Sequence, residues 1–387
     1  MNGAEPAPLG VWLVGARGSV ATVTMAGAAA VARGLVPPTG MVTEHEPLDG
    51  VPMSPLGSLA FGGHDVRGGS VAESARALAR EPEVLDPSVL AALDGDLERL
   101  EAHVRPAPQA PPGAPAREEV RAIREDIDRF ARETGARRVV VVNVASTEPP
   151  VPDHPAHHDP AALEAALDEP EASGALPPSA RYAYAALSSG RPYVNFTPST
   201  GASLPSLERL ALERGVPHAG RDGKTGETLL KTVLAPMFAM RRLRVRGWAG
   251  LNLLGNGDGR TLADPEASRS KVASKGRAVP RILGYEADTV VRIDYVPSLG
   301  DRKVAWDLID FEGFLGSPMS LQLTWRASDS ALAAPLVLDL ARLMDLAAER
   351  GAAGAQGHLA FFFKDPLGSD VHDLSAQFAM LREHIGC

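Results

Sequence analysis

Two lysines four residues apart follow a glycine-rich acidic loop near the middle of the chain. The loop runs from Leu254 to Gly259 (LGNGDG), and Lys271 and Lys275 come shortly after it. Side chains at this spacing share one face of a helix, where two like charges repel each other by roughly a few tenths of a kcal/mol. By itself such a pair is more often a solvated basic face. The alternative is an anionic partner, either a bound anion or an oxygen that becomes negative during a reaction.

Two further lysines favour the anionic partner. Lys303 ends the sequence GDRK after a strand-like run, and Lys364 directly follows three phenylalanines at 361–363. A lysine that ends an aromatic run is expected to be partly desolvated, which makes its pKa adjustable. The four lysines together therefore predict a site that stabilises negative charge.

The first predicted element of the chain is typical of dinucleotide binding. Leu9–Val14 is a short apolar run that predicts a buried parallel strand, and it is followed by the glycine turn Gly15–Ala21 (GARGSVA) and an alanine-rich helix to about Arg33. The glycines allow the pyrophosphate of a dinucleotide to approach free backbone amides. The turn is a degraded form of the usual fingerprint, and Glu44 and Glu46 lie in a loop-like segment, so this pattern identifies no ribose contact.

Polar residues follow two more predicted strands. Arg138–Val144 is a second buried strand, and it ends in Ala145-Ser-Thr147-Glu148; the segment 192–200, with Asn195, is a third such place. Open α/β sheets bind ligands at the carboxyl ends of their strands. Helical patterns are predicted at 71–80, 87–104 and 118–134, and the proline-rich segment 105–115 is predicted to be a surface connection.

The character of the chain changes after about Thr228. Strand-like runs at 243–254, 289–296 and 320–325 follow one another with few helices, and helical periodicity returns at 331–350. We therefore predict an α/β protein with a discontinuous Rossmann-like NAD-binding domain, residues 1–227 and 333–387, and an inserted, mostly antiparallel α+β domain, residues 228–332.

Composition and charge argue against several classes of protein. The net charge of −9 and the pI near 5.6 argue against a general binder of nucleic acid or of anionic membranes. The one cysteine is Cys387, so no intrachain disulfide or cysteine zinc site is expected. No secretory pattern and no run of about 18 apolar residues occurs, so we expect a cytoplasmic protein. The proline-interrupted cluster His154–Asp159 (HPAHHD) is a weak metal candidate, and its role is left open.

Several separated motifs resemble those of the inositol-1-phosphate synthases. The matching segments are Gly220–Thr228, Gly255–Gly259, Arg269–Lys275, Val296–Lys303 and Ser328–Pro335. The likeness is strongest from about Val216 to Pro366 and extends more weakly to Gly15–Ala21, Gly63–Asp65 and Ala145–Glu148. Motifs in the right order over this length are more specific than any single glycine loop.

The resemblance implies an NAD-dependent ring closure of glucose 6-phosphate to myo-inositol 1-phosphate without net redox change. The C5 hydroxyl is oxidised, the ketone enolises at C6, C6 attacks the C1 aldehyde, and the ketone is reduced again. Each step places negative charge on an oxygen, so ammonium groups are the expected electrostatic catalysts.

The resemblance also assigns roles to individual residues. Lys271 matches the lysine at the C5 hydroxyl, Lys364 the one near the C1 oxygen, and Lys275 and Lys303 those near the phosphate. Asp222 and Asp329 match acidic residues that set lysine protonation and orientation. The positions matching substrate-binding residues are Asn195, Thr225, Gly226, Glu227, Asn252 and Leu254. The positions matching cofactor-binding residues are Gly15, Ala16, Arg17, Gly18, Ser19, Val20, Asp65, Ala145, Ser146, Thr147 and Asp258.

The chain departs from the family pattern at positions that line the substrate. The usual Ser-Gly-Gln is Thr225-Gly226-Glu227, which places a carboxylate near a phosphorylated sugar unless Lys224, Arg221 or protonation compensates it. The second asparagine of the glycine loop is Gly257, and Phe196 begins an atypical stretch after Asn195. These changes suggest altered sugar specificity with the lysine chemistry kept.

Three alternatives to the inositol-phosphate synthase remain. The first is a related cyclase that closes fructose 6-phosphate to a five-membered cyclitol phosphate, as in carbocyclic natural-product biosynthesis. The others are a noncatalytic NAD-binding regulator and an ordinary sugar-phosphate dehydrogenase. For the inositol-phosphate synthase and for the related cyclase, the expected small-molecule partner is a sugar phosphate. No nucleic acid or membrane partner is expected. The resemblance suggests a homotetramer assembled through the insert, and it leaves a divalent or monovalent cation requirement open.

Overall fold

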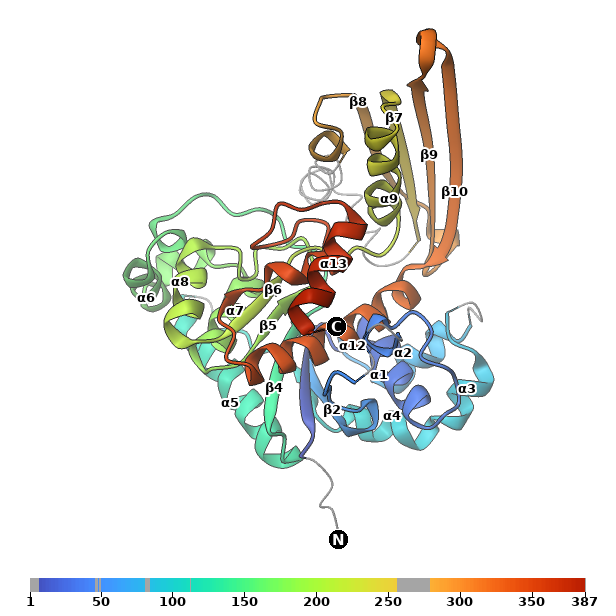
Figure 1. Cartoon of the computed structure of the whole chain (residues 1–387). Helices are drawn as coiled ribbons and strands as arrows, with labels where there is room; N and C mark the ends of the chain where they lie inside the picture. The colour runs from blue at the N-terminus through green and yellow to red at the C-terminus, as the bar shows by residue number, and fades with distance from the viewer. Residues whose placement is uncertain are drawn as a thin grey trace.

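The computed structural model describes residues 7–45, 48, 50–80, 84–111, 113–255 and 279–386. These residues form two separate sheets, one of seven strands and one of four. Figure 1 shows the four-stranded sheet standing to one side of the larger sheet, with the hairpin of its last two strands pointing away from the rest of the molecule.

The seven-stranded sheet is parallel throughout and has the order β11-β6-β5-β4-β1-β2-β3. Its strands are β1 (Leu9–Val14), β2 (Leu59–Asp65), β3 (Val104–Pro106), β4 (Arg138–Asn143), β5 (Tyr193–Asn195), β6 (Pro217–Gly220) and β11 (Gly354–Ala355). The chain moves outward from β1 in one direction through β2 and β3, and in the other through β4, β5 and β6. The order therefore reverses between β1 and β4, which is where such sheets bind ligands.

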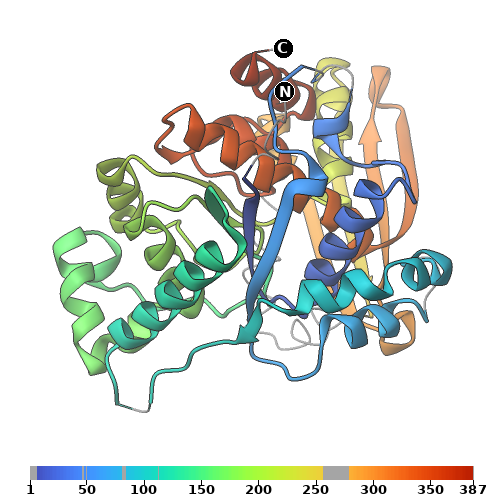
Figure 2. The same ribbon diagram turned by 90° about the horizontal axis from the view of Figure 1, so that it is seen from below.

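Helices cover both faces of this sheet, so its central strands are buried on both sides. Figure 2 shows α1 (Ser19–Ala32) on one side of the central strands and α5 (Ala116–Thr134) on the other. The first side is completed by α12 (Asp329–Glu349), which packs on α1, and the second by α7 (Pro178–Ser188) and α8 (Pro205–Arg214). Double coverage explains why the β1 sequence is apolar at every position rather than alternating. The predicted α/β class is confirmed.

The four-stranded sheet has the order β10-β9-β7-β8. Its strands are β7 (Arg244–Leu254), β8 (Asp288–Tyr295), β9 (Arg302–Glu312) and β10 (Pro318–Ser328). The pairs β7–β9 and β9–β10 are antiparallel and β7–β8 is parallel, so the sheet is mostly antiparallel as expected. Helix α9 (Glu227–Met240) packs on one face through Phe238, which lies in a core with Trp248 and Ile309.

The remaining elements are shorter helices, most of them around the large sheet; η6 and η7 belong to the connections of the four-stranded sheet. The α-helices are α2 (Val71–Leu78), α3 (Pro87–Ala92), α4 (Asp94–Glu101), α6 (Pro160–Asp168) and α13 (Leu374–Ile385). The 3-10 helices are η1 (Val42–Glu44), η3 (Leu56–Ser58), η4 (Pro155–His157), η5 (Pro170–Ala175), η6 (Pro297–Leu299), η7 (Phe314–Gly316) and η8 (Gly357–Phe362). Within the described ranges no helix combines the length and the apolar character that crossing a membrane requires.

Several parts of the structure differ from the sequence-based expectation. The helical pattern at 87–104 is divided at Leu93 into α3 and α4, and its end is the edge strand β3. Pro106 can end β3 because an edge strand tolerates a residue without an N–H. Other elements without a predicted counterpart include β2, α7, α8, α9 and β9. The predicted domain boundaries remain predictions. The second boundary, at residue 333, falls inside helix α12.

Candidate active site

A pocket of about 740 Å³ opens at the carboxyl ends of β1, β2 and β4, where the strand order reverses. It also reaches the loops after β5 and β6 and the starts of β9 and α12. The predicted site residues that line it are Gly15, Gly18, Ser19, Val20, Asp65, Ala145, Ser146, Thr147, Asp222, Thr225, Lys303, Asp329 and Lys364.

One end of the pocket is the glycine turn after β1. Gly15 has a φ of +88°, and a Cβ there would lie 2.8 Å from the Cα of Ala145, so only glycine fits. The amides of Gly15 and Ala16 donate to the carbonyl of His64, which holds the turn against β2. Gly18 is the N-cap of α1 and has no side chain to fill the space before the helix. This cradle suits the pyrophosphate of a dinucleotide.

An acidic residue, Asp65, lies at the end of the second strand of the sheet, a position that the glycine pattern alone did not reveal. It ends β2 and is 4% exposed, and its carboxylate accepts hydrogen bonds from the backbone amides of Arg17 (2.7 Å) and Arg67 (2.8 Å). The long segment between α1 and β2 moves Asp65 far beyond the usual sequence spacing. The Arg17 side chain turns away to Glu101, at 2.6 Å, and neither Ala16 nor Arg17 lines the pocket.

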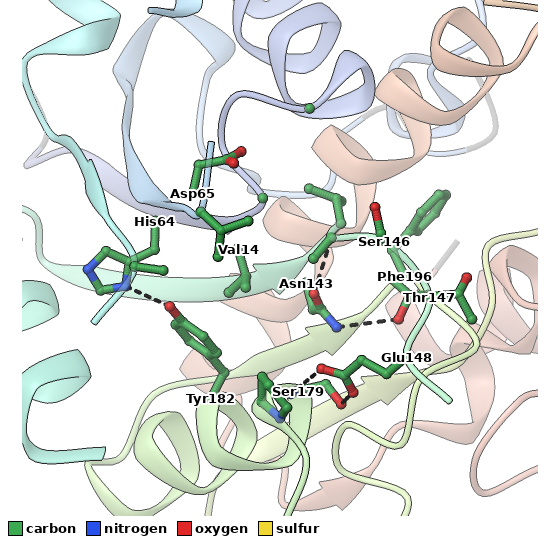
Figure 3. Close-up of a pocket in the computed structure, with 18 of the residues that line it drawn as sticks. Val14, His64, Asp65, Asn143, Ser146, Thr147, Glu148, Ser179, Tyr182 and Phe196 are labelled. Atoms are coloured by element: carbon green, nitrogen blue, oxygen red, sulfur yellow. Dashed lines mark hydrogen bonds between the residues drawn. The ribbon is translucent and has the colours of Figure 1, made fainter. Parts of the chain in front are cut away.

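Two buried asparagines, Asn143 and Asn195, shape the middle of the pocket through a network of hydrogen bonds. Asn143 donates through Nδ2 to Asn195 Oδ1 (3.2 Å) and Thr197 Oγ1 (3.3 Å), and Asn195 Nδ2 donates to the carbonyl of Ser199 (2.7 Å). Figure 3 shows Asn143 near the centre of the view, with Ser146 and Phe196 on the same side of it. Asn195 does not itself line the pocket, but it shapes the loop whose Phe196 and Thr197 do.

Glu148 and Ser179 are pocket residues to which the sequence analysis gave no role. Ser179 donates to Glu148 through its backbone amide (2.8 Å) and through its hydroxyl, as Figure 3 shows. Burial raises the pKa of Glu148, and the bonds from Ser179 oppose that shift. His64 bonds Tyr182 Oη at 2.8 Å, and burial lowers the pKa of His64 to about 4. The position of Glu148 after β4 was the only sequence signal for these residues.

The other end of the pocket contains two lysine–aspartate pairs. Lys364 Nζ donates to Asp222 Oδ1 at 2.6 Å, and both residues are buried. The segments that carry them are joined by a bridge between Gly223 and Phe363 and by the Lys364 amide, which donates to the Asp222 carbonyl. Gly223 is required because a Cβ would lie 2.1 Å from the Phe196 ring.

The second pair is Lys303 with Asp329, at 3.1 Å between Nζ and Oδ1. Thr225 Oγ1 donates to the same oxygen at 3.3 Å. Asp301, to which the sequence analysis gave no role, accepts from Ser328 Oγ (2.6 Å) and Ser330 Oγ (2.8 Å) and so ties the start of β9 to the start of α12. Burial raises the pKa of Asp301, opposed by these bonds.

Several predicted residues do not line the pocket or are not described. Gly226, Glu227, Asn252 and Leu254 lie beside it but are not among its lining residues. Lys271, Lys275, Asp258 and Gly257 lie outside the described residues.

The partner of Glu227 differs from the expected one. Glu227 Oε1 accepts from Lys231 Nζ at 2.6 Å, one helical turn along α9. Arg221 instead pairs with Asp365 at 2.9 Å, and Lys224 donates to Gln377. The expected compensation by Lys224 or Arg221 is therefore replaced by Lys231, because α9 places positions four apart on one face.

Lysine is rare in this chain and every described lysine is buried. Only six of the 39 basic residues are lysines, at 224, 231, 271, 275, 303 and 364. The four described ones, Lys224, Lys231, Lys303 and Lys364, are 3%, 2%, 7% and 7% exposed. The rest of these 39 residues are arginines.

In the histidine cluster at 154–158, the rings of His154 and His157 form hydrogen bonds with nearby backbone groups. The ring of His154 accepts from the Ala156 amide, and His157 Nε2 bonds the carbonyl of Ala175 at 2.7 Å. Asp159 caps α6. Across the described part of the chain, no group of three or more histidine, cysteine, aspartate or glutamate side chains is arranged to hold a metal ion.

The fold and the pocket are those of an α/β enzyme. A glycine turn that suits a dinucleotide lies at one end of the pocket, and two lysine–aspartate pairs lie at the other. A family model described as myo-inositol-1-phosphate synthase matches residues 9–385. The chain belongs to this family, so the resemblance seen in its motifs is confirmed.

Individual relatives agree with this assignment. Inositol-3-phosphate synthase 1 of Bacteroides thetaiotaomicron is 36% identical over 412 residues, covering 97% of this chain and 94% of that protein. The synthase of Spirodela polyrhiza is 33% identical over 271 residues, 67% of this chain but only 52% of that longer protein. The structure of inositol-3-phosphate synthase from Caenorhabditis elegans has a TM-score of 0.86 at 22% identity, covering 98% of this chain and 86% of that one.

Proposed function

We propose that this protein closes glucose 6-phosphate to myo-inositol 1-phosphate by internal oxidation, enolisation, aldol closure and re-reduction, with NAD as cofactor. The observation that carries this proposal is that one pocket has the glycine cradle and Asp65 at one end and two lysine–aspartate pairs at the other. Hydride transfer alone needs one acid or base, whereas a sequence of steps that each charge an oxygen needs several cations.

The cofactor is held by Gly15, Gly18 and Ser19 at its pyrophosphate and by Asp65 at a ribose. When bound, NAD supplies an acceptor for the C5 hydride and later returns it. The free amides at the start of α1 and the close approach that Gly15 permits support this placement.

The lysines act on the sugar. Lys364 stabilises the C1 alkoxide of the aldol step, Lys303 and Lys275 hold the phosphate, and Lys271 moves the proton of the C5 hydroxyl. The phosphate dianion can take the C6 proton. Asp222 and Asp329 lie within hydrogen-bond distance of Lys364 and Lys303, so they orient these ammonium groups.

A second candidate is closure of fructose 6-phosphate to a five-membered cyclitol phosphate by the same steps. The observation that favours it is the buried Glu227–Lys231 pair beside the substrate end, where a neutral amide was expected. A dehydrogenase or a noncatalytic NAD-binding regulator is the alternative in which no ring closes.

We also propose that the chain forms a homotetramer through the four-stranded sheet. Phe314 and Leu315, at the tip of the β9–β10 hairpin, are 88% and 90% exposed, and Val290 on β8 is 54% exposed. Adjacent exposed apolar side chains such as Phe314 and Leu315 favour a subunit interface at the hairpin tip.

The deciding experiment incubates the purified protein with NAD and either glucose 6-phosphate or fructose 6-phosphate and identifies products by NMR. We expect cyclitol phosphate far in excess of the NAD supplied, with no lasting rise in NADH absorbance, because the same cofactor takes and returns the hydride. NADH formed in proportion to a ketone product would favour a dehydrogenase, and no product from either sugar would favour the regulator. Dialysis against EDTA, then addition of Mg²⁺ or K⁺, tests for a cation requirement.

A further inference from the structure

Three side chains beside the cofactor end of the pocket form a chain of hydrogen bonds. They are Asp126 on α5, His64 on β2 and Tyr182 on α7. His64 Nε2 lies 3.2 Å from Asp126 Oδ2, and His64 Nδ1 lies 2.8 Å from Tyr182 Oη. His64 and Tyr182 line the pocket. The proposed mechanism uses none of the three, although the chain ends in an oxygen at the pocket wall.

The chemistry of these groups fixes the direction of both hydrogen bonds. The Asp126 carboxylate is 20% exposed and pairs with Arg129 at 3.5 Å, so it only accepts. Burial lowers the pKa of His64 to about 4, so its ring is neutral near pH 7 and carries one N–H. That N–H faces the carboxylate at Nε2. Nδ1 is then an acceptor, and Tyr182 must donate its proton to it.

The Tyr182 oxygen consequently has only acceptor capacity left for a ligand. Burial raises the pKa of Tyr182, so the hydroxyl keeps the proton that it donates to His64. Within the described ranges no second hydrogen bond reaches this oxygen. A largely buried acceptor of this kind stabilises a ligand that offers an N–H and disfavours one that offers a carbonyl.

Tyr182 lies near the place proposed for the cofactor ribose. Asp65 directly follows His64 in β2, and its charge adds to the effect of burial on the Tyr182 pKa. Figure 3 shows Tyr182, His64 and Asp65 on one side of the pocket, with Ser146 and Thr147 on the other. The base of a dinucleotide is bonded directly to its ribose, so a ribose held by Asp65 places the base on the Tyr182 side.

The walls of this side suit a flat base. The segment after β3 is tied to the end of β2, because the Ala107 amide donates to the Asp65 carbonyl at 2.9 Å. That segment contributes Pro108 and Pro111 to the pocket lining, and Val66 adds a third apolar side chain. Apolar walls with a few polar groups that fix orientation are usual in small-molecule sites.

We propose that Tyr182 selects adenine as the base of the cofactor, with His64 and Asp126 as positioning residues that make its oxygen an acceptor. This inference rests on the cofactor part of the proposed function. Adenine carries an amino group at C6, which donates hydrogen bonds. Hypoxanthine is a purine of similar size with a carbonyl at C6, which accepts them. Tyr182 therefore favours NAD over nicotinamide hypoxanthine dinucleotide.

The test measures the Kd of each of these two dinucleotides by isothermal titration calorimetry without sugar phosphate, so turnover plays no part. Tyr182→Phe removes the oxygen and keeps the ring. Asp126→Asn keeps the shape, but its amide can donate to His64, which then turns its own proton toward Tyr182 and frees the hydroxyl to donate. Asp128→Asn is the matched control, because Asp128 lies on the same helix and pairs with Arg191.

We expect wild type to bind NAD at least about tenfold more tightly than the hypoxanthine dinucleotide. Tyr182→Phe and Asp126→Asn should each bring the two Kd values to within about threefold of each other, and Asp128→Asn should keep the wild-type preference. Adding Asp126→Asn to Tyr182→Phe should change the preference no further, because the aspartate acts through the tyrosine. A purely structural aspartate would weaken both dinucleotides equally and leave their ratio unchanged.

Equal Kd values in wild type, or a preference that survives either Tyr182→Phe or Asp126→Asn, would overturn the inference. Failure of the proposed function gives a different result. If the protein shows this pattern of Kd values but makes no cyclitol phosphate from either sugar, the proposed reaction is wrong and the inference is supported. A protein that binds neither dinucleotide overturns both.

Discussion

Lys364 and Asp222 lie 142 positions apart in the chain and meet through a hydrogen bond of 2.6 Å at the wall of the pocket. Their backbones are also bonded, since the Lys364 amide donates to the Asp222 carbonyl at 2.7 Å. The ammonium is therefore held by both the fold and its partner carboxylate. Such preorganisation is what electrostatic catalysis at a developing alkoxide requires.

The first prediction concerns this pair. Lys364→Met should lower kcat by about 10²-fold or more, because it removes the cation proposed at the C1 oxygen. Lys364→Arg should not restore activity, since a guanidinium differs in shape and proton chemistry. Steady-state kinetics and Tm are measured together, and Arg246→Gln, which is 55% exposed, is the control. A Lys364→Met enzyme with near wild-type kcat would remove this lysine from the mechanism.

The second prediction concerns Lys271, which lies outside the described residues. If it moves the C5 proton, Lys271→Ala should abolish turnover while NAD affinity and Tm stay nearly unchanged. Lys271→Arg should fail to rescue, because a guanidinium does not give up its proton at working pH. If Lys271→Ala kept more than about a tenth of wild-type kcat, the loss would be smaller than general acid–base catalysis normally contributes, and the assignment would be withdrawn.

The control for that experiment has to be an exposed basic residue, which excludes the buried Lys224. It donates to Gln377, lies 5.8 Å from the centre of the Phe361 ring, and is only 3% exposed. An exposed arginine such as Arg244 is the better control, since its side chain is 74% exposed.

The third prediction concerns the pH dependence that Lys224 creates. Burial lowers the pKa of Lys224 from 10.5 to about 7, and the charge of Asp373 opposes this shift. Between these two values the unfolded chain binds a proton that the folded protein has released, so this lysine makes stability rise with pH above about 7. The cost of burying the charged form is complete below that pH.

The measurement is the Tm of Lys224→Met and of wild type from pH 6 to 9. The difference between them should shift in favour of wild type as pH rises, because the variant lacks the group that becomes neutral. A difference that stays constant over this range would mean that Lys224 keeps its charge in the folded protein.

The fourth prediction concerns assembly. Phe314→Ser/Leu315→Ser should lower the molar mass measured by light scattering if the exposed hairpin tip contributes to the proposed tetramer. Since these two side chains contact solvent in the single chain, Tm of the monomeric unit should change little. A wild-type protein that elutes as a monomer at all concentrations would contradict the proposal directly.

The sequence alone was sufficient for the framework around the cofactor. Val11 and Val140 sit in apolar runs that form neighbouring central strands, because only strands buried on both faces are apolar at successive positions. The glycine turn after β1 was recognisable because Gly15 occupies a conformation and a close contact that other residues cannot. Four lysines in family-like motifs pointed to charge stabilisation before any geometry was known.

Tertiary structure decided which charges meet. Helix α9 had no clear sequence signal, so the i, i+4 relation of Glu227 and Lys231 was missed, and Asn252 reaches the same carboxylate only because β7 packs beneath that helix. The segment 107–114 reads as a surface connection, yet most of it lines the pocket, because β3 pairs at the sheet edge and directs it there. Local propensity depends on neighbours in the chain, whereas the pairing of buried charges depends on which elements pack together, and that is determined only when the whole chain folds.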